Sequence, residues 1–233
     1  MDSPRPESLR LAVFDCDGTL VDSGHSIVAA MHAACDEHDC AKPAAADVRR
    51  MVGLPLAEAF AGLLPGAGAE TLAKLKESYQ NAFAAMRRRG EVREPLFPGA
   101  LEGLTIMEEA GWLLGMATGK SRRGLAATLD GHGLGERFVT LQTADRCRGK
   151  PHPEMLLNAM AETNAKPSST AMIGDTTYDM EMARNAGTLA VGVSWGYHGV
   201  DELRSAGAHA IAERCADLPA IFTDIVSRVH DAG

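Results

Sequence analysis

The sequence predicts an α/β protein with a doubly wound parallel sheet and a helical insertion after the first strand. From about residue 94 onward, short apolar runs alternate with helix-like stretches. This alternation is typical of βαβ units and of a parallel sheet covered on both faces. An earlier apolar run ends at Asp15 and is followed, over residues 24–93, by helical patterns only. Because the early run resembles the later ones, we expect it to join the same sheet.

The individual elements follow from hydrophobic periodicity and from glycine and proline breakers. Strands buried on both faces are expected at about residues 9–15, 112–117, 138–141, 170–173, 189–193 and 208–211. In the insertion, Ile27, Ala30, Met31 and Ala34 recur at helical spacing. Further helices are expected at about residues 45–51, 55–63, 69–89 and 217–230, with a short flexible lead at residues 1–8.

Composition limits the possible functions. The 233 residues suit one large domain or one domain with a smaller insertion, and the net charge of -8 argues against broad nucleic-acid binding. The five cysteines are an odd number and are widely spread, which favours reduced thiols in the cytoplasm. We find neither a signal-peptide pattern nor an apolar run long enough to cross a membrane. We therefore expect a cytoplasmic protein without membrane or nucleic-acid partners.

Chemically active side chains follow the predicted strands where those strands end. Asp15 and Asp17 follow the first strand, Thr118 follows the second, and Asp175 follows the fourth, while Lys150 lies in the loop behind the third. Ligands of open α/β sheets bind beyond the carboxyl ends of the strands. Carboxylates, a hydroxyl and a lysine at one sheet edge suit a phosphoryl group with a hard divalent cation.

The roles of these residues follow from charge. A carboxylate such as Asp15 can attack phosphorus and form an aspartyl-phosphate, and a second carboxyl group, Asp17, can transfer protons. Lys150 and a hydrogen bond from Thr118 would stabilise the phosphoryl oxygens. Asp15 and Asp175 form a plausible carboxylate pair for Mg²⁺. Asp179, four residues after Asp175, is expected to orient Lys150 or a metal-bound water.

The same residues resemble the four motifs of the haloacid-dehalogenase-like phosphatases. The motifs read Asp15-Cys16-Asp17-Gly18-Thr19, Thr118, Lys150-Pro151 and Gly174-Asp175-x-x-x-Asp179. The resemblance implies a Rossmann-like core over residues 1–23 and 94–233 and an all-helical cap domain over residues 24–93. It further implies that Asp15 is the nucleophile, that Asp17 is the acid/base, and that Mg²⁺ is held by Asp15, Asp175 and the backbone carbonyl of Asp17. We expect Thr118, Gly119 and Lys150 to bind the substrate phosphate.

Two cap and linker segments, residues 48–56 and 96–99, look most like the phosphoglycolate phosphatase branch. The favoured hypothesis is a Mg²⁺-dependent phosphatase for a small metabolite, with 2-phosphoglycolate as the best single substrate. Arg49 would then bind a substrate carboxylate, or simply lie on an exposed helix face. The alternatives are a phosphatase for a sugar phosphate, nucleotide or pyrophosphate, and a non-catalytic phosphate-sensing module. We expect a monomer or a homodimer.

Overall fold

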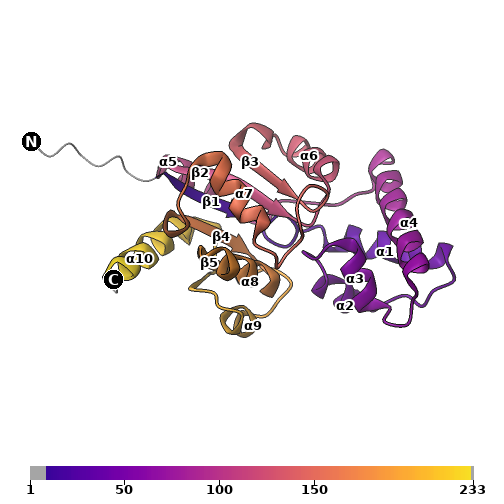
Figure 1. Ribbon diagram of the computed structural model, residues 1–233. Helices are drawn as coiled ribbons and strands as arrows, with labels where there is room; N and C mark the ends of the chain where they lie inside the picture. Colours follow the sequence, from indigo (N-terminus) through magenta and orange to yellow (C-terminus); the bar gives the residue numbers. More distant parts are fainter. Residues whose placement is uncertain (1–8, 232–233) are drawn as a thin grey trace, which may run out of the picture.

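The computed structural model describes residues 9–231 and contains a six-stranded parallel sheet with the order β3-β2-β1-β4-β5-β6 (Figure 1). The strands are β1 Arg10–Phe14, β2 Trp112–Thr118, β3 Phe138–Thr143, β4 Thr170–Gly174, β5 Leu189–Val193 and β6 Ala210–Ala212. The predicted α/β fold class is confirmed. The lead predicted for residues 1–8 lies outside the described residues.

Helices cover both faces of this sheet, and β1 shows why. Ala12 and Phe14 pack into an apolar cluster with α5, α6 and α10, whereas Leu11 and Val13 pack on the opposite face with α7, α8 and α9. Because successive side chains of a strand point to opposite faces, a continuous apolar run is what a doubly covered strand requires. These helices are α5 Ala100–Glu109, α6 Arg122–Gly131, α7 Glu154–Thr163, α8 Thr177–Ala186, α9 Val200–Ser205 and α10 Leu218–Asp231. Short 3₁₀ helices occupy Gly135–Arg137, Pro167–Ser169 and Cys215–Asp217.

The insertion is helical throughout and has its own apolar core. It consists of α1 Gly24–Glu37, α2 Ala45–Arg50, α3 Leu56–Leu63 and α4 Ala69–Arg88. The apolar stripe predicted for α1 is buried and packs with Phe60 of α3 and with Leu75 and Tyr79 of α4. The insertion lies at the end of the core where the site residues were expected, and we refer to it below as the cap (Figure 1).

Two chain segments connect the cap to the core, and they run side by side. Val21 forms an antiparallel bridge with Leu96. The Asp22 N–H donates to the Pro95 carbonyl at 2.8 Å, and the Phe97 N–H donates to the Leu20 carbonyl at 2.9 Å. These contacts join the segment that leaves the core to the segment that returns from the cap. Any movement of the cap relative to the core therefore has to bend these two segments.

The cap is seated on the core by contacts at the end of α2. Arg50 forms a two-pronged ion pair with Glu202 of α9, at 2.7 and 3.3 Å. The Thr177 N–H donates to Nδ1 of His198, so the proton of this imidazole lies on Nε2, which donates to the Arg50 carbonyl at 3.0 Å. Next to Lys150, Gly149 packs directly against Pro55 of the cap. The structure is therefore a form in which cap and core are in contact.

Replacing Gly149 with alanine is expected to block this seating. The added methyl group would lie 2.1 Å from Cγ of Pro55, too close for any real contact. In the phosphatase that the sequence predicts, a closed cap would exclude water from the site, so we expect kcat to fall at least about tenfold with little loss of thermal stability. Gly131→Ala is the matched control, since a methyl group there meets nothing within 4 Å. Equal kcat values for the two variants would contradict the seating role of Gly149.

Two further expectations concern the whole chain. All five cysteines are free thiols, as their odd number and wide spacing predict. In the part of the chain from residue 9 to residue 231, no helix combines the length and the apolar composition that membrane crossing requires.

Candidate active site

The sheet topology brings the predicted residues together at one edge. Asp15 follows β1, Thr118 ends β2, and Asp175 follows β4. Lys150 comes from the loop after β3, and all four residues are buried. The Asp15 N–H donates to the Ile173 carbonyl at 2.9 Å, which continues the pairing of β1 with β4 up to the site. The predicted gathering of these residues is present.

Lys150 links two carboxylates in the interior. Its Nζ lies 2.8 Å from Asp15 Oδ1 and 2.6 Å from Asp179 Oδ1. Asp179 is fixed by the start of α8, where its Oδ2 accepts the N–H of Thr176 at 3.0 Å and the hydroxyl of Thr176 at 2.6 Å. This reciprocal capping arrangement leaves Asp179 Oδ1 directed at the lysine. Asp179 thus contacts Lys150, one of the two positions considered for it from the sequence.

Asp175 is held by donors from two other segments. Its Oδ1 accepts the Thr19 hydroxyl and its Oδ2 accepts the Tyr197 N–H, both at 2.9 Å. Gly18 packs against the same carboxylate with a φ of +87°, and a methyl group there would lie 2.2 Å from Asp175 Oδ2. The first motif therefore requires glycine at position 18, since any larger residue would displace Asp175.

Negative charge is in excess here. Burial raises the pKa of Asp15 despite the opposing effect of Lys150, and burial with repulsion from Asp15 and Asp179 raises the pKa of Asp175. Single oxygens of Asp15, Asp175 and Asp179 lie within 4.8 Å of one another. Among the described residues, Asp15 Oδ2 is buried and has no hydrogen-bond partner. Clustered carboxylate oxygens with one unsatisfied atom fit a hard divalent cation such as Mg²⁺.

The predicted metal set and this cluster overlap without being identical. Asp15 and Asp175 belong to both, and Asp179 joins them in the structure. Both oxygens of Asp179 are engaged, Oδ1 with Lys150 and Oδ2 with Thr176, so Asp179 offers the cation less than Asp15, whose Oδ2 has no hydrogen-bond partner. The backbone carbonyl of Asp17 as a ligand stays a prediction from the motif resemblance.

Asp17 has separate partners. Its Oδ1 accepts the hydroxyl of Ser23 and lies 2.9 Å from Lys120 Nζ. Lys120 Nζ also lies 3.0 Å from Glu94 Oε1, in the segment that returns from the cap. Burial alone would lower the pKa of Lys120, but the charges of Asp17, Cys16 and Glu94 raise it above its usual value. Lys120 is therefore a largely buried cation that pairs with the second aspartate, Asp17, as Lys150 pairs with Asp15.

Sequence reasoning missed Lys120 and Glu94. A signal for Lys120 was available, since it follows Thr118 by two residues in the same predicted loop. No local signal in the sequence pointed to Glu94, because only the folding of the cap and its return segment brings Glu94 to Lys120. Glu94 is further held by Arg87 of α4, at 2.8 Å, and by the Thr128 hydroxyl.

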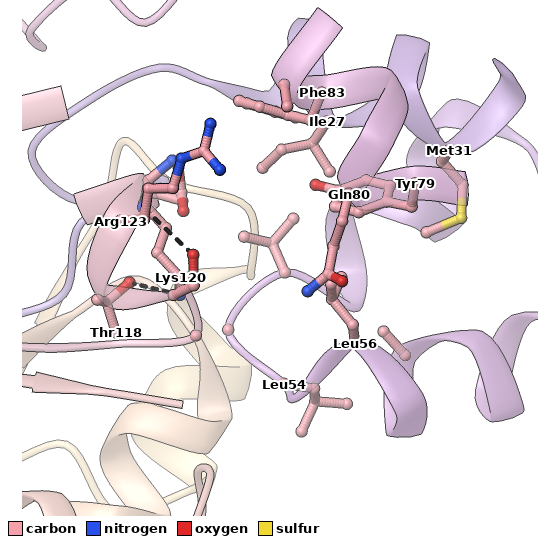
Figure 2. Close-up of a pocket in the computed structure, with 18 of the residues that line it drawn as sticks. Ile27, Met31, Leu54, Leu56, Tyr79, Gln80, Phe83, Thr118, Lys120 and Arg123 are labelled. Carbon is pink, nitrogen blue, oxygen red and sulfur yellow. Dashed lines mark hydrogen bonds and ion pairs between the residues drawn. The ribbon is translucent and has the colours of Figure 1, made fainter. Parts of the chain in front are cut away.

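A cavity of about 570 Å³ opens between this edge and the cap (Figure 2). Asp15, Asp17, Thr118 and Gly119 line it from the core side. The Thr118 oxygen accepts the Lys120 N–H at 3.2 Å, which leaves the hydroxyl proton available to a bound ligand. A phosphate group placed here would meet the Asp15 carboxylate, the Thr118 hydroxyl and the Lys120 ammonium at once.

Arg49 was predicted to bind substrate, and the structure places it elsewhere. It is not among the residues that line the cavity in the described part of the chain. Its Nε lies beside Gly24, at the start of α1. The neighbouring Arg50 is engaged with Glu202. A contact of Arg49 with substrate stays a prediction.

The comparisons with known proteins agree with this geometry. Residues 12–193 match the family model described as haloacid dehalogenase-like hydrolase. The chain is 36% identical to "Probable phosphatase IndB" of Dickeya dadantii, covering 94% of this chain and 93% of the relative. It is 28% identical to a phosphoglycolate phosphatase of Synechococcus elongatus, covering 94% and 99% respectively.

A solved structure of a hydrolase from Pseudomonas syringae is similar over 93% of this chain and 99% of that one, with a TM-score of 0.81 and 27% identity. The four motifs, their arrangement at one sheet edge and the family match all assign the chain to the same family. The chain belongs to the haloacid dehalogenase-like hydrolases, as its motifs predict, and the relatives that it matches are phosphatases.

Proposed function

We propose that this protein is a Mg²⁺-dependent phosphatase that hydrolyses a small-molecule phosphomonoester through an aspartyl-phosphate on Asp15. The observation that carries the proposal is the placing of Asp15 in the cavity. It is buried beside Lys150 and lines the same cavity as Thr118, and a second carboxylate, Asp17, is paired with Lys120.

The proposed reaction has two displacements at phosphorus. A carboxylate oxygen of Asp15 attacks phosphorus, the bond to the ester oxygen breaks, and that oxygen takes the proton that Asp17 carries into this step. A water that gives its proton to Asp17 then attacks the same phosphorus and releases phosphate and free Asp15. Lys150 and Thr118 stabilise the phosphoryl oxygens in both steps. Mg²⁺, held by Asp15 and Asp175, would offset the negative charge shared by the carboxylates and the phosphate.

The best substrate predicted from the sequence is 2-phosphoglycolate, and the Synechococcus relative of that name supports it. The competing substrates are sugar phosphates, nucleotides and pyrophosphate. The rival of another class is a phosphate-sensing module without turnover, which is disfavoured because every catalytic position holds a competent residue. We further propose a cytoplasmic enzyme that acts as a monomer or homodimer.

Turnover of p-nitrophenyl phosphate with and without Mg²⁺ tests the reaction class. We expect hydrolysis with Mg²⁺ and almost none in EDTA. Failure to hydrolyse this ester or any member of a panel of phosphorylated metabolites would favour the sensing module. Ranking the panel by kcat/KM then identifies the substrate class.

Removing Mg²⁺ is also expected to change stability in a pH-dependent way. The pKa values of buried Asp15 and Asp175 are raised, so the folded protein binds more protons than the unfolded chain. Without metal, the free energy of unfolding therefore decreases as the pH rises above about 4, where unfolded carboxyl groups ionise. Mg²⁺ binds the ionised form and should raise Tm at pH 7.5 more than at pH 5.

Thermal unfolding in EDTA and in Mg²⁺ at both pH values checks this prediction. Asp175→Asn should lose most of the Mg²⁺-dependent rise in Tm, because it removes one of the proposed ligands. A Tm that does not respond to Mg²⁺ at pH 7.5 would contradict the metal site without any reference to activity.

A further inference from the structure

The cavity beside Asp15 is larger than a glycolate group requires. Its volume of about 570 Å³ lies within the range of about 300–1,000 Å³ that sites for drug-sized ligands occupy. Because the cap already contacts the core through Arg50 and Pro55, this space is not the gap left by a detached cap. The leaving group of the substrate can therefore be considerably larger than the phosphate.

The cap side of the cavity is mostly apolar, although Gln80, Asn81, Arg87 and Arg88 also line it. Figure 2 shows Ile27 and Met31 of α1, Tyr79 and Phe83 of α4 and Leu56 of α3 across the cavity from Thr118 and Lys120. Phe83 is only partly buried; its ring is tilted against that of Tyr79 at 6.0 Å, and Lys120 Nζ and Arg87 Cζ lie over it at 5.6 and 5.7 Å from its centroid. A mostly apolar wall with a partly exposed aromatic ring favours carbon surface over a small polar group.

The cations of the cavity are distributed in a way that also argues for a large leaving group. Lys120 is neutralised by Asp17 and Glu94, and Arg87 is neutralised by Glu94. Arg88 and Arg123 also line the cavity, but both are exposed. A small carboxylate would therefore have to compete with Asp17 and Glu94 for the paired cations, whereas a largely apolar leaving group needs no cation beyond those that hold the phosphate.

We propose that the substrate is a phosphomonoester of an alcohol with a ring-sized, largely apolar body, bound against Phe83, Tyr79 and Ile27. The inference rests on the proposed phosphatase function and specifies the leaving group. It ranks such esters above 2-phosphoglycolate, the substrate favoured by the sequence. Phe83 is the specificity-determining residue, since its partly exposed ring offers apolar surface that the leaving group covers.

The test compares benzyl phosphate, ethyl phosphate and 2-phosphoglycolate, which are all esters of primary alcohols. We expect kcat/KM for benzyl phosphate to exceed that for each of the other two at least about tenfold, through a lower KM. Phe83→Ala should reduce the benzyl-to-ethyl ratio severalfold, and Phe83→Leu should reduce it less. The ratio cancels any effect of the variants on the chemistry that both esters share.

Met86→Ala is the matched control, because Met86 lies on the same helix and packs into the cap core but does not line the cavity. It should leave the ratio unchanged. Hydrolysis of 2-phosphoglycolate or ethyl phosphate as efficient as that of benzyl phosphate would overturn the inference and leave the phosphatase intact. So would an unchanged ratio in Phe83→Ala. Absence of hydrolysis for all three esters and for p-nitrophenyl phosphate would overturn the proposed function, and the inference with it.

Discussion

Asp15→Asn is expected to lower kcat by about 10⁴-fold or more while the protein stays folded. The amide is nearly the same size but cannot attack phosphorus, so no aspartyl-phosphate can form. Stability should be unchanged or higher, because the change removes one charge from three crowded acids and Lys150 keeps Asp179 as a partner. Steady-state kinetics and thermal unfolding of the same preparation measure both effects.

Asp22→Asn is the matched control for this variant. Asp22 follows in the same segment, but its side chain is exposed and lies outside the cavity lining. It should retain activity close to that of the unchanged protein. Phosphatase activity retained in Asp15→Asn, after contaminating enzyme has been excluded, would contradict the proposed mechanism.

Lys150→Met is the second change with a large expected effect, and it should affect stability as well as catalysis. Lys150 is fully buried between Asp15 and Asp179, so its loss leaves buried carboxylates without their cation. Breaking such a buried pair costs about 3–5 kcal/mol. The loss of a positive charge beside the phosphoryl oxygens should lower kcat by about 10²–10³-fold.

Two comparisons separate these consequences. Lys166→Met removes an exposed lysine and should change neither Tm nor kcat. Lowering the pH favours protonation of Asp15, whose pKa is raised by burial, so the Tm deficit of Lys150→Met should shrink on going from pH 7.5 to pH 5. A variant with normal Tm and normal kcat would show that the ion pairs of Lys150 contribute nothing measurable.

Most of the fold was predictable because its signals are local. The apolar run before Asp15 is continuous because Ala12 and Phe14 face one layer of helices while Leu11 and Val13 face the other. The weak run at residues 208–211 was harder to delimit. The strand there is the short edge strand β6, Ala210–Ala212, which is only partly buried and so lacks a strong apolar signature.

The Lys150 cluster was predictable for a different reason. In a parallel sheet, residues at the ends of different strands meet at one edge, so Asp15, Thr118 and Asp175 could be grouped without knowledge of distances. The contacts around Asp17 were harder to predict. Lys120 follows Thr118 in the same loop and so had a local signal, but Glu94 pairs with Lys120 only because the cap leaves and re-enters the core beside the site.

The apolar wall on the cap side of the cavity was the least predictable part of the site. Ile27, Tyr79 and Phe83 have the spacing of ordinary core residues of helices, and the sequence does not distinguish those that face the cavity from those that face the cap interior. Arg49, by contrast, looked suitable for an anionic substrate from its residue type alone. Which face of a helix borders a cavity depends on the packing of the whole cap on the core.

The most direct test of the central claim is detection of phosphate on Asp15 during turnover. The protein is mixed with Mg²⁺ and excess p-nitrophenyl phosphate, quenched in acid, digested and analysed by mass spectrometry. We predict a hydroxylamine-sensitive phosphate adduct on the peptide that contains Asp15, which is absent in Asp15→Asn. It should accumulate further in Asp17→Asn, where water activation is impaired. Rapid turnover without any adduct, or an adduct on a different residue, would contradict the aspartyl-phosphate mechanism.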